Sequence, residues 1–449
     1  MLDQAGRQQF DRRTLLAGGA AIGGLLLSGC GREDPSGFGA EGLQRLRSRL
    51  EHQIEAGFAP GAVGLIARGP HVETFVLGKM AFGGSADMRR DTIFRIASMT
   101  KAVTATAVMM LVEEGKLRID EPVDRLLPEL ANRRVLRRID AELDDTVPAK
   151  RPITVEDLLT FRCGLGIILA PRGRYPIQKA IDDLDISAVG FGPPDPAMPL
   201  DGDAWMQKLN GLPLLAQPGE DFFYTAGSNI QGVLVARASG KPMSRFFEER
   251  IFGPLGMKDT AFFVPPAKID RLVTAYRSDG VVVSDVPATG KWSRPPKFEQ
   301  GDAGLVSTAD DFLAFARMLL ADGQHRGQAL LTPASAKAMK TNHLTAAQRA
   351  GGEMILGRGR GWGYGMSVVT DAVLGRGRGW GYGKSVVTDA VTGQPAPGSF
   401  GWNGGYGSSW ISDPAADLTM ILLTQHEFTG PGGYPIHQEF QGDAYRALQ

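Results

Sequence analysis

Hydrophobic and polar positions along this chain recur with two periods, one typical of helices and one typical of strands. Apolar and charged residues alternate at helical spacing from Glu41 to Gln53. Two apolar runs, 61–68 and 72–77, flank a Gly-Pro pair, and this arrangement predicts a β-hairpin. A long apolar run from Thr100 to Glu114 ends at Gly115, which predicts a helix closed by a glycine cap.

The middle of the chain, from about 120 to 265, has mostly helical periodicity, and the last third returns to strand-like runs. Strands at both ends with helices between them predict one sheet assembled from distant segments. We therefore expect an α/β (α+β) fold with an α/β lobe of residues 40–119 and 266–449 and an inserted, mainly helical lobe of residues 120–265. The remaining predicted elements are helices at 154–160, 230–239, 243–251 and 309–320 and strands at 272–276, 410–412 and 418–424.

Residues 1–30 read as an export signal and not as part of the fold. Arg12-Arg13 precede an apolar, glycine-rich run, a pattern typical of secretory signals and, with paired arginines, of the twin-arginine route. The run is too short and too rich in glycine for a membrane span. It ends in Leu27-Ser28-Gly29-Cys30, which resembles a bacterial lipobox. We expect a periplasmic lipoprotein, lipidated at Cys30, with a linker at 31–39; an ordinary cleaved signal is the alternative.

Composition excludes one broad class of partner. The 449 residues include 49 Lys+Arg and 49 Asp+Glu, so the formal net charge is zero. A neutral chain lacks the cationic field of general nucleic-acid binding proteins. Only one cysteine besides Cys30 exists, Cys163, so lipidation of Cys30 would exclude an internal disulfide. No histidine is near Cys163 in sequence, and a small buried hydrophobic residue is the favoured role over a nucleophile.

A tandem repeat interrupts the last third. Residues 356–373 and 374–391 are identical except that Met366 is replaced by Lys384. Two glycine-rich copies are too few for a solenoid, so a duplicated strand segment is the better interpretation. The second copy leads directly to Phe400, and we expect it to form the structural strand while the first copy is an exposed loop. On this hypothesis, deletion of residues 356–373 leaves folding and activity largely intact.

The first group with chemical potential is Ser98-Met99-Thr100-Lys101 at the head of the apolar helix. Residues three apart share a helix face, so the Lys101 amine can reach the Ser98 hydroxyl. Serine is a weak nucleophile unless a nearby base takes its proton. Burial and the positive end of a helix both disfavour an ammonium, so a buried lysine here is a candidate base. The alternative is a serine N-cap followed by a surface lysine.

Two further groups are candidate partners of this pair. Tyr224 stands just before a predicted helix, as either a core ring or a second proton carrier. The segment Trp402-Asn403-Gly404-Gly405 leads into a strand, and its glycines permit close approach of backbone to a ligand. The backbone N–H of Gly405 can complete an oxyanion hole opposite that of Ser98.

Together these groups resemble the serine β-lactamase-like hydrolases, which carry S-x-x-K as the nucleophile motif, and most closely the family VIII carboxylesterases. The likeness extends over nearly the whole mature chain and includes Pro254–Met257 and Gly301–Leu305. It implies a β-lactamase/transpeptidase-like fold, in which an antiparallel sheet is flanked by helices.

The resemblance also implies roles. Ser98 is the acylated nucleophile, Lys101 and Tyr224 form the base and proton-relay pair, and Trp402-Asn403-Gly404 occupies the third motif. Lactam-active members usually have Lys-Thr-Gly or Lys-Ser-Gly there, and Trp402 provides no charge for a substrate carboxylate. They also usually have asparagine or serine where this chain has Ala226, so we expect a serine esterase for small neutral esters.

Other functions remain as alternatives or are excluded. A D-stereospecific amidase or peptidase and a weak β-lactamase are the enzymatic alternatives, and a penicillin- or peptidoglycan-binding lipoprotein is the non-enzymatic one. Lys384-Ser385-Val386 imitates the missing third motif, but valine obstructs the approach that glycine permits. No G-x-S-x-G elbow, H-E-x-x-H pair or Cys/His cluster occurs, so we expect no metal or cofactor. His426 follows an apolar run and is interpreted as a strand-end polar residue.

Overall fold

The computed structural model describes residues 37–186, 195–277, 279, 282–371, 394–428 and 434–448. The predicted export signal, Cys30, most of the predicted linker and the second repeat copy lie outside these residues. None of the described helices is both long enough and apolar enough to cross a membrane.

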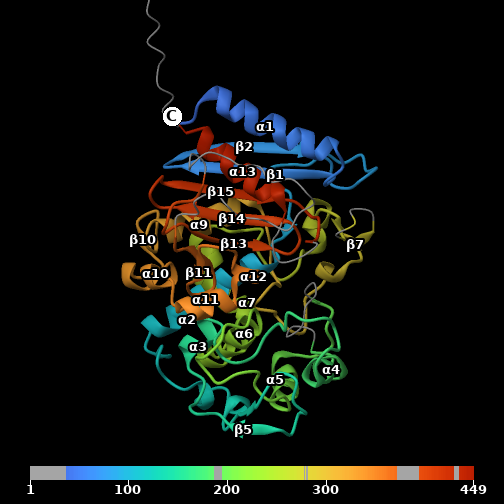
Figure 1. The fold of residues 1–449 in the computed structure, drawn as a ribbon. Helices are drawn as coiled ribbons and strands as arrows, with labels where there is room; N and C mark the ends of the chain where they lie inside the picture. The colour runs from blue at the N-terminus through green and yellow to red at the C-terminus, as the bar shows by residue number, and fades with distance from the viewer. Residues whose placement is uncertain are drawn as a thin grey trace, which may run out of the picture. The chain divides into compact units, whose positions relative to one another are not determined.

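A seven-stranded antiparallel sheet organises the chain, in the order β11-β12-β13-β14-β15-β1-β2 (Figure 1). The two segments that supply it lie far apart in sequence, which confirms the expectation of one sheet with strands from both ends. Its strands are β1 (Gly61–Arg68), β2 (His71–Gly78), β11 (Arg360–Trp362), β12 (Ser367–Val369), β13 (Phe400–Gly404), β14 (Ser408–Asp413) and β15 (Leu418–Leu423).

Both faces of the sheet are covered, and β1 shows why its sequence is apolar without interruption. Ala62 and Ile66 face the core under helices α1 (Ala40–Glu55) and α13 (Pro435–Arg446), which cover one side (Figure 1). Val63, Leu65 and Ala67 face the larger core on the other side. Because successive side chains of a strand point to opposite faces, a strand buried on both faces needs apolar residues at every position.

Helix α2 (Thr100–Glu113) lies within that larger core. Its residues from Thr100 to Leu111 are all buried, so the helix is enclosed on every side by protein. Helix α6 (Ala226–Ser239) packs against it, and α9 (Ala309–Leu320) packs against β15. The bounds of α9 are those that the sequence predicted, 309–320.

The middle of the chain forms further helices, which gather away from α1 in Figure 1. The predicted helix at 243–251 is present as two pieces, because α7 (Met243–Phe247) continues into a wider turn, Glu248–Phe252. The predicted strand at 272–276 shortens to β6 (Ala275–Tyr276). The other middle helices are α3 (Val155–Leu159), α4 (Pro176–Asp183) and α5 (Gly202–Asn210).

The repeat does not fold as expected. The first copy supplies β11 and β12, and β12 pairs with β13 through Ser367 and Val368. Trp362 and Met366 are both 0% exposed. The prediction of an exposed first copy is therefore wrong, which removes the reason for expecting residues 356–373 to be dispensable. Met366 belongs to the main hydrophobic core, where a lysine such as Lys384 would bring a charge, so adjacency to β13 in sequence did not decide the outcome.

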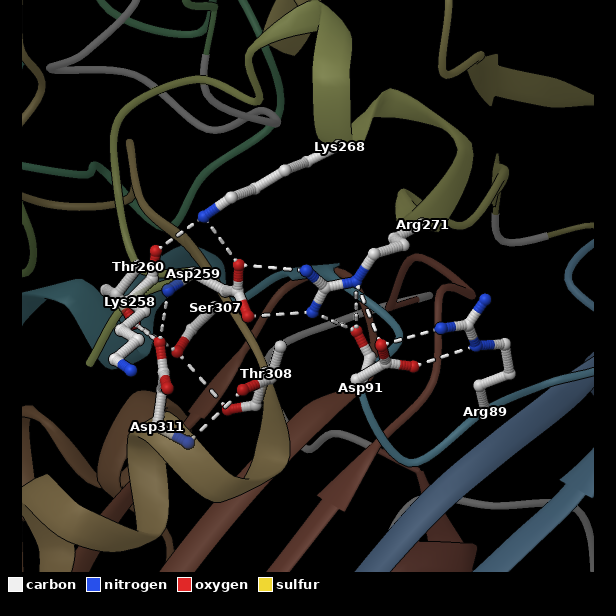
Figure 2. A network of polar contacts seen from close by, with 10 residues as sticks. All are labelled: Arg89, Asp91, Lys258, Asp259, Thr260, Lys268, Arg271, Ser307, Thr308 and Asp311. Atoms are coloured by element: carbon white, nitrogen blue, oxygen red, sulfur yellow. Dashed lines mark hydrogen bonds and ion pairs between the residues drawn. The ribbon is translucent and has the colours of Figure 1, made fainter. Parts of the chain in front are cut away.

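A network of charged side chains joins the segment before Ser98 to residues 258–271 and to the start of α9 (Figure 2). Arg271 donates to both carboxylate oxygens of Asp259, at 3.0 and 2.7 Å, and to the backbone oxygen of Asp91. Lys268 Nζ lies 2.8 Å from the same Asp259 carboxylate. Asp91 lies three residues before strand β3 (Phe94–Arg95), which leads to Ser98, so this network anchors the segment that precedes Ser98.

The same network reaches the first turn of α9. The Asp311 carboxylate accepts from the backbone N–H of Asp259 at 2.7 Å and from the Thr260 hydroxyl at 3.0 Å (Figure 2). Burial nevertheless raises the pKa of Asp311 to about 6. The carboxyl group thus joins two segments while remaining sensitive to pH.

Candidate active site

Ser98 stands on a short turn between a strand and a helix. Strand β3 (Phe94–Arg95) pairs with β8 (Val306–Ser307), a 3-10 turn spans Ala97–Met99, and α2 then begins at Thr100. Ala97 has φ of +43°, a left-handed conformation that non-glycine residues rarely adopt. Such local strain is typical of functional sites, and here it lies directly before the nucleophile candidate.

Lys101 is placed as the spacing predicted. Its Nζ lies 3.0 Å from Ser98 Oγ and 2.8 Å from the backbone oxygen of Asp302. The side chain is almost completely enclosed, since Lys101 is 1% exposed. It forms no ion pair within the described part of the chain. Burying an ammonium without a paired carboxylate costs free energy, so this environment is unlike that of a surface lysine.

Asp302 is a neighbour that sequence reasoning did not single out. Its carboxyl accepts from the Thr225 hydroxyl at 3.1 Å, and its backbone N–H donates to Asn229 Oδ1. Burial raises the pKa of Asp302, while the charge of Lys101 acts in the opposite direction. The only signal in the sequence was its place in the Gly301–Leu305 segment, which carried no role by itself.

Tyr224 lies beside Lys101 but not in the arrangement that a direct relay requires. Lys101 Nζ sits over the Tyr224 ring, 4.6 Å from its centroid. The Tyr224 hydroxyl accepts a hydrogen bond from Trp402 Nε1 at 2.5 Å. Within the described residues it makes no hydrogen bond to Ser98 or Lys101. The fold therefore brings together the three predicted catalytic residues and joins Tyr224 to the third motif.

The end of β13 runs beside the segment that precedes Ser98. A Cβ added to Gly404 would lie 2.3 Å from the Ile96 oxygen, so only glycine fits there. The Ile96 oxygen accepts a hydrogen bond from Ser408 Oγ on β14, at 3.1 Å. Gly405 follows with open space around it, and Asn403 pairs with Ser409 in the sheet register. The predicted oxyanion segment thus lies against Ile96, two residues before Ser98, where only glycine permits the approach.

Aromatic rings surround Tyr224 from several distant segments. The Trp362 and Trp402 rings meet edge to face at 4.9 Å, and the Tyr224 ring lies 5.6 Å from Trp402. Phe161 packs edge to face on Tyr224 at 5.6 Å, with Phe222 next to it. Sequence reasoning missed this cluster, because Trp362 lies in the repeat that was expected to be exposed.

The remaining candidates have structural surroundings. Cys163 is fully buried, and burial raises its pKa to about 12, which confirms a packing role over a nucleophilic one. His426 follows β15, and its ring packs against Phe58 and Tyr434. No cluster of three or more side chains suited to a metal ion occurs in the ranges that the structure describes.

A serine and a lysine one helical turn apart, at the head of a buried helix beside an antiparallel sheet, are typical of serine hydrolases of the S-x-x-K type. Residues 46–437 match the family described as Beta-lactamase, and the chain belongs to this family. It is an enzyme, a serine hydrolase with the β-lactamase/transpeptidase-like fold, as the resemblance implied.

Relatives place the chain within this family. Protein Rv1367c of Mycobacterium tuberculosis is 38% identical over 85% of this chain and 89% of its own length. Esterase EstB of Burkholderia gladioli is 30% identical over 89% of this chain and 95% of its own length. The solved structure of EstCE1, described as a hydrolase with promiscuous acyltransferase activity, superposes with a TM-score of 0.69 at 24% identity, covering 91% of this chain and 98% of its own.

Proposed function

We propose that this protein hydrolyses small carboxylic esters through an acyl-enzyme formed on Ser98. The observation that carries the proposal is the 3.0 Å contact between Lys101 Nζ and Ser98 Oγ, at an enclosed position where Lys101 forms no ion pair with any residue that the structure describes. The similarity to Esterase EstB over nearly the full length of both chains supports esters as the substrate class.

In this mechanism Lys101 takes the proton of Ser98 as Oγ attacks the ester carbonyl. The bond from the carbonyl carbon to the alcohol oxygen then breaks, and the alcohol leaves after receiving a proton by way of Tyr224. Water attacks the acyl-enzyme in the second half of the reaction, with the proton movements reversed. Ser98 regains its hydrogen and the carboxylic acid is released.

Two backbone N–H groups are suited to stabilise the oxyanion. One belongs to Ser98 at the head of α2, where the helix dipole also favours negative charge. The other belongs to Gly405, which follows the close approach of Gly404 to Ile96. A Cβ at residue 404 would push the end of β13 away from the backbone oxygen of Ile96. Gly404 therefore determines how close the N–H of Gly405 lies to the N–H of Ser98.

The third motif favours neutral esters over penicillin-like acids. Trp402 donates a hydrogen bond but has no charge to hold a substrate carboxylate. The imitation motif at Lys384 lies outside the described residues. A D-stereospecific amidase or peptidase, a weak β-lactamase and a penicillin-binding protein without turnover are the competing outcomes of a substrate panel.

The experiment compares wild type with Ser98→Ala on p-nitrophenyl acetate, p-nitrophenyl butyrate and a chromogenic cephalosporin. We expect turnover of both esters with little cephalosporin hydrolysis, and a loss of about 10⁴-fold or more in kcat/KM for Ser98→Ala. Ser239→Ala, whose hydroxyl contacts only nearby backbone and lies at the end of α6, is the matched control. Retained turnover in Ser98→Ala contradicts the nucleophile assignment, and binding without turnover in wild type supports the non-enzymatic function.

We also propose that the mature protein is an exported lipoprotein anchored through Cys30. The support is the sequence pattern of Arg12-Arg13, the apolar run and the lipobox-like ending. Cys30→Ala should move the protein from the membrane fraction to the soluble fraction of a bacterial host. An unchanged distribution would favour another mode of attachment.

A further inference from the structure

The hydrogen bond between Trp402 and Tyr224 joins two motifs that lie 178 residues apart in sequence. An indole N–H can only donate, so the Tyr224 oxygen must accept. The phenol's own hydrogen is therefore not used in this contact and is free to point toward another oxygen in the site. The direction of the bond is fixed by chemistry, since no rotation of either group reverses it.

Both rings are held in place from several sides. Trp402 lies on β13 opposite Trp410, and its ring meets Trp362 at 88°. The Tyr224 ring is fixed by an edge-to-face contact with Phe161, and its backbone oxygen accepts from Ile167 at 2.6 Å. A hydrogen bond between two rings held in this way has little freedom to break and re-form.

We propose that Trp402 is a positioning residue that holds the Tyr224 oxygen as an acceptor and directs the Tyr224 proton toward the leaving alcohol. The inference rests on the proposed ester hydrolysis. During acylation Ser98 Oγ bonds to the carbonyl carbon, the bond to the alcohol oxygen breaks, and that oxygen takes the Tyr224 proton. Trp402 N–H then donates to the resulting phenolate. In deacylation the phenolate takes a proton from the attacking water, and Ser98 regains its proton from Lys101.

This role explains why an uncharged residue works at the third motif. A hydrogen bond to a charged oxygen is roughly twice as strong as one between neutral groups, so the N–H of Trp402 stabilises the phenolate more than the phenol. The stabilisation is larger after proton transfer than before it, which is the condition for catalysis. Trp402 thus serves the proton donor and not a substrate carboxylate.

The test uses two esters of the same acid that differ in their need for a proton. p-Nitrophenolate leaves readily without protonation, whereas ethoxide does not. We expect Trp402→Phe, in the full chain, to lower kcat/KM about tenfold or more on ethyl butyrate and by less than about threefold on p-nitrophenyl butyrate. Tyr224→Phe should show the same selectivity, and the double variant should be no worse than Tyr224→Phe alone because both changes remove one function.

Trp362→Phe is the matched control. It changes an indole of the same cluster whose N–H donates to the Leu159 oxygen at 3.3 Å and not to Tyr224. If a substitution only alters packing, it should lower kcat/KM on both esters by the same factor, and we expect this result for Trp362→Phe. An equal loss on both esters in Trp402→Phe, or additive effects in the double variant, would overturn the inference. Absence of hydrolysis of either ester by wild type would instead contradict the proposed function.

Discussion

Two polar regions of this molecule surround a cationic side chain with different kinds of partner. In the charged network of Figure 2, Arg271 faces two carboxylates, Asp259 and Asp91, and its side chain is 17% exposed. At the candidate active site, Lys101 is more deeply buried, and its hydrogen-bond partners among the described residues are the Ser98 hydroxyl and the backbone oxygen of Asp302. The first region pairs its arginine with carboxylates, and the second gives its amine neutral hydrogen-bond partners.

The difference in partners corresponds to a difference in role between a structural cation and a proposed base. A cation bound by carboxylates is stabilised in its charged form and fixes the segments that it joins. In the proposed mechanism Lys101 accepts a proton from Ser98, and carboxylates around it would oppose that role by stabilising the charged form. The network includes Asp91, seven residues before Ser98, so its paired charges support the segment that carries the proposed nucleophile.

The largest effect is expected at the unpaired amine. Lys101→Ala should lower kcat/KM on p-nitrophenyl butyrate by about 10⁴-fold, because Ser98 loses its base. Lys101→Arg should fail similarly, since a guanidinium does not give up its proton. Combining Lys101→Ala with Ser98→Ala should cost little more than either change alone. Lys340→Ala is the control, because that lysine is paired with Asp322 and its loss should affect stability but not turnover.

The repeat supplies a second way to place a lysine in the core. Deletion of residues 374–391 should leave the free energy of unfolding almost unchanged. Deletion of residues 356–373 leaves only the copy in which Lys384 takes the place of Met366, and should lower that free energy by about 3 kcal/mol or more. Adding Lys384→Met to the variant that lacks residues 356–373 should restore the free energy of unfolding, as measured by urea unfolding. Equal stability of the two deletions would contradict the burial argument.

The carboxyl group of Asp311 should give the network a pH dependence. Its folded pKa of about 6 exceeds the ordinary value of 3.8, so between these values the folded state binds more protons than the unfolded state. The stability contributed by Asp311 is therefore present at low pH and lost as the pH rises through 6. Relative to Asp311→Asn, the free energy of unfolding of wild type should fall by about 2.4 kcal/mol from pH 4 to 7. A pH-independent difference would contradict this assignment.

The smallest effect is expected from opening the network at Arg271. Burial alone raises the pKa of Asp259, but hydrogen bonds from Arg271 and Lys268 bring it below its ordinary value. Arg271→Met leaves that carboxylate with Lys268 and should cost about 2 kcal/mol of stability, less than for a fully buried pair. Turnover at saturating ester should change less than twofold. A loss of kcat comparable to that of Lys101→Ala would show that the network takes part in the reaction itself.

Local sequence determined the Ser98–Lys101 part of the candidate active site. The spacing of Ser98 and Lys101 follows from helix geometry, and the apolar run of α2 ensures that the lysine is enclosed. The β1–β2 hairpin and α9 were predictable for the same reason, because their periodicity is set by neighbours in the chain. These features require no knowledge of distant contacts.

Only the tertiary structure decided the rest. The hydrogen bond from Trp402 to Tyr224 and the contact of Lys101 with Asp302 join residues far apart in sequence, and no local pattern encodes such pairs. The repeat is the clearest case, since two nearly identical segments have the same local preferences. Burial in the core favours the copy with Met366, because a methionine fills an apolar site that a lysine would charge.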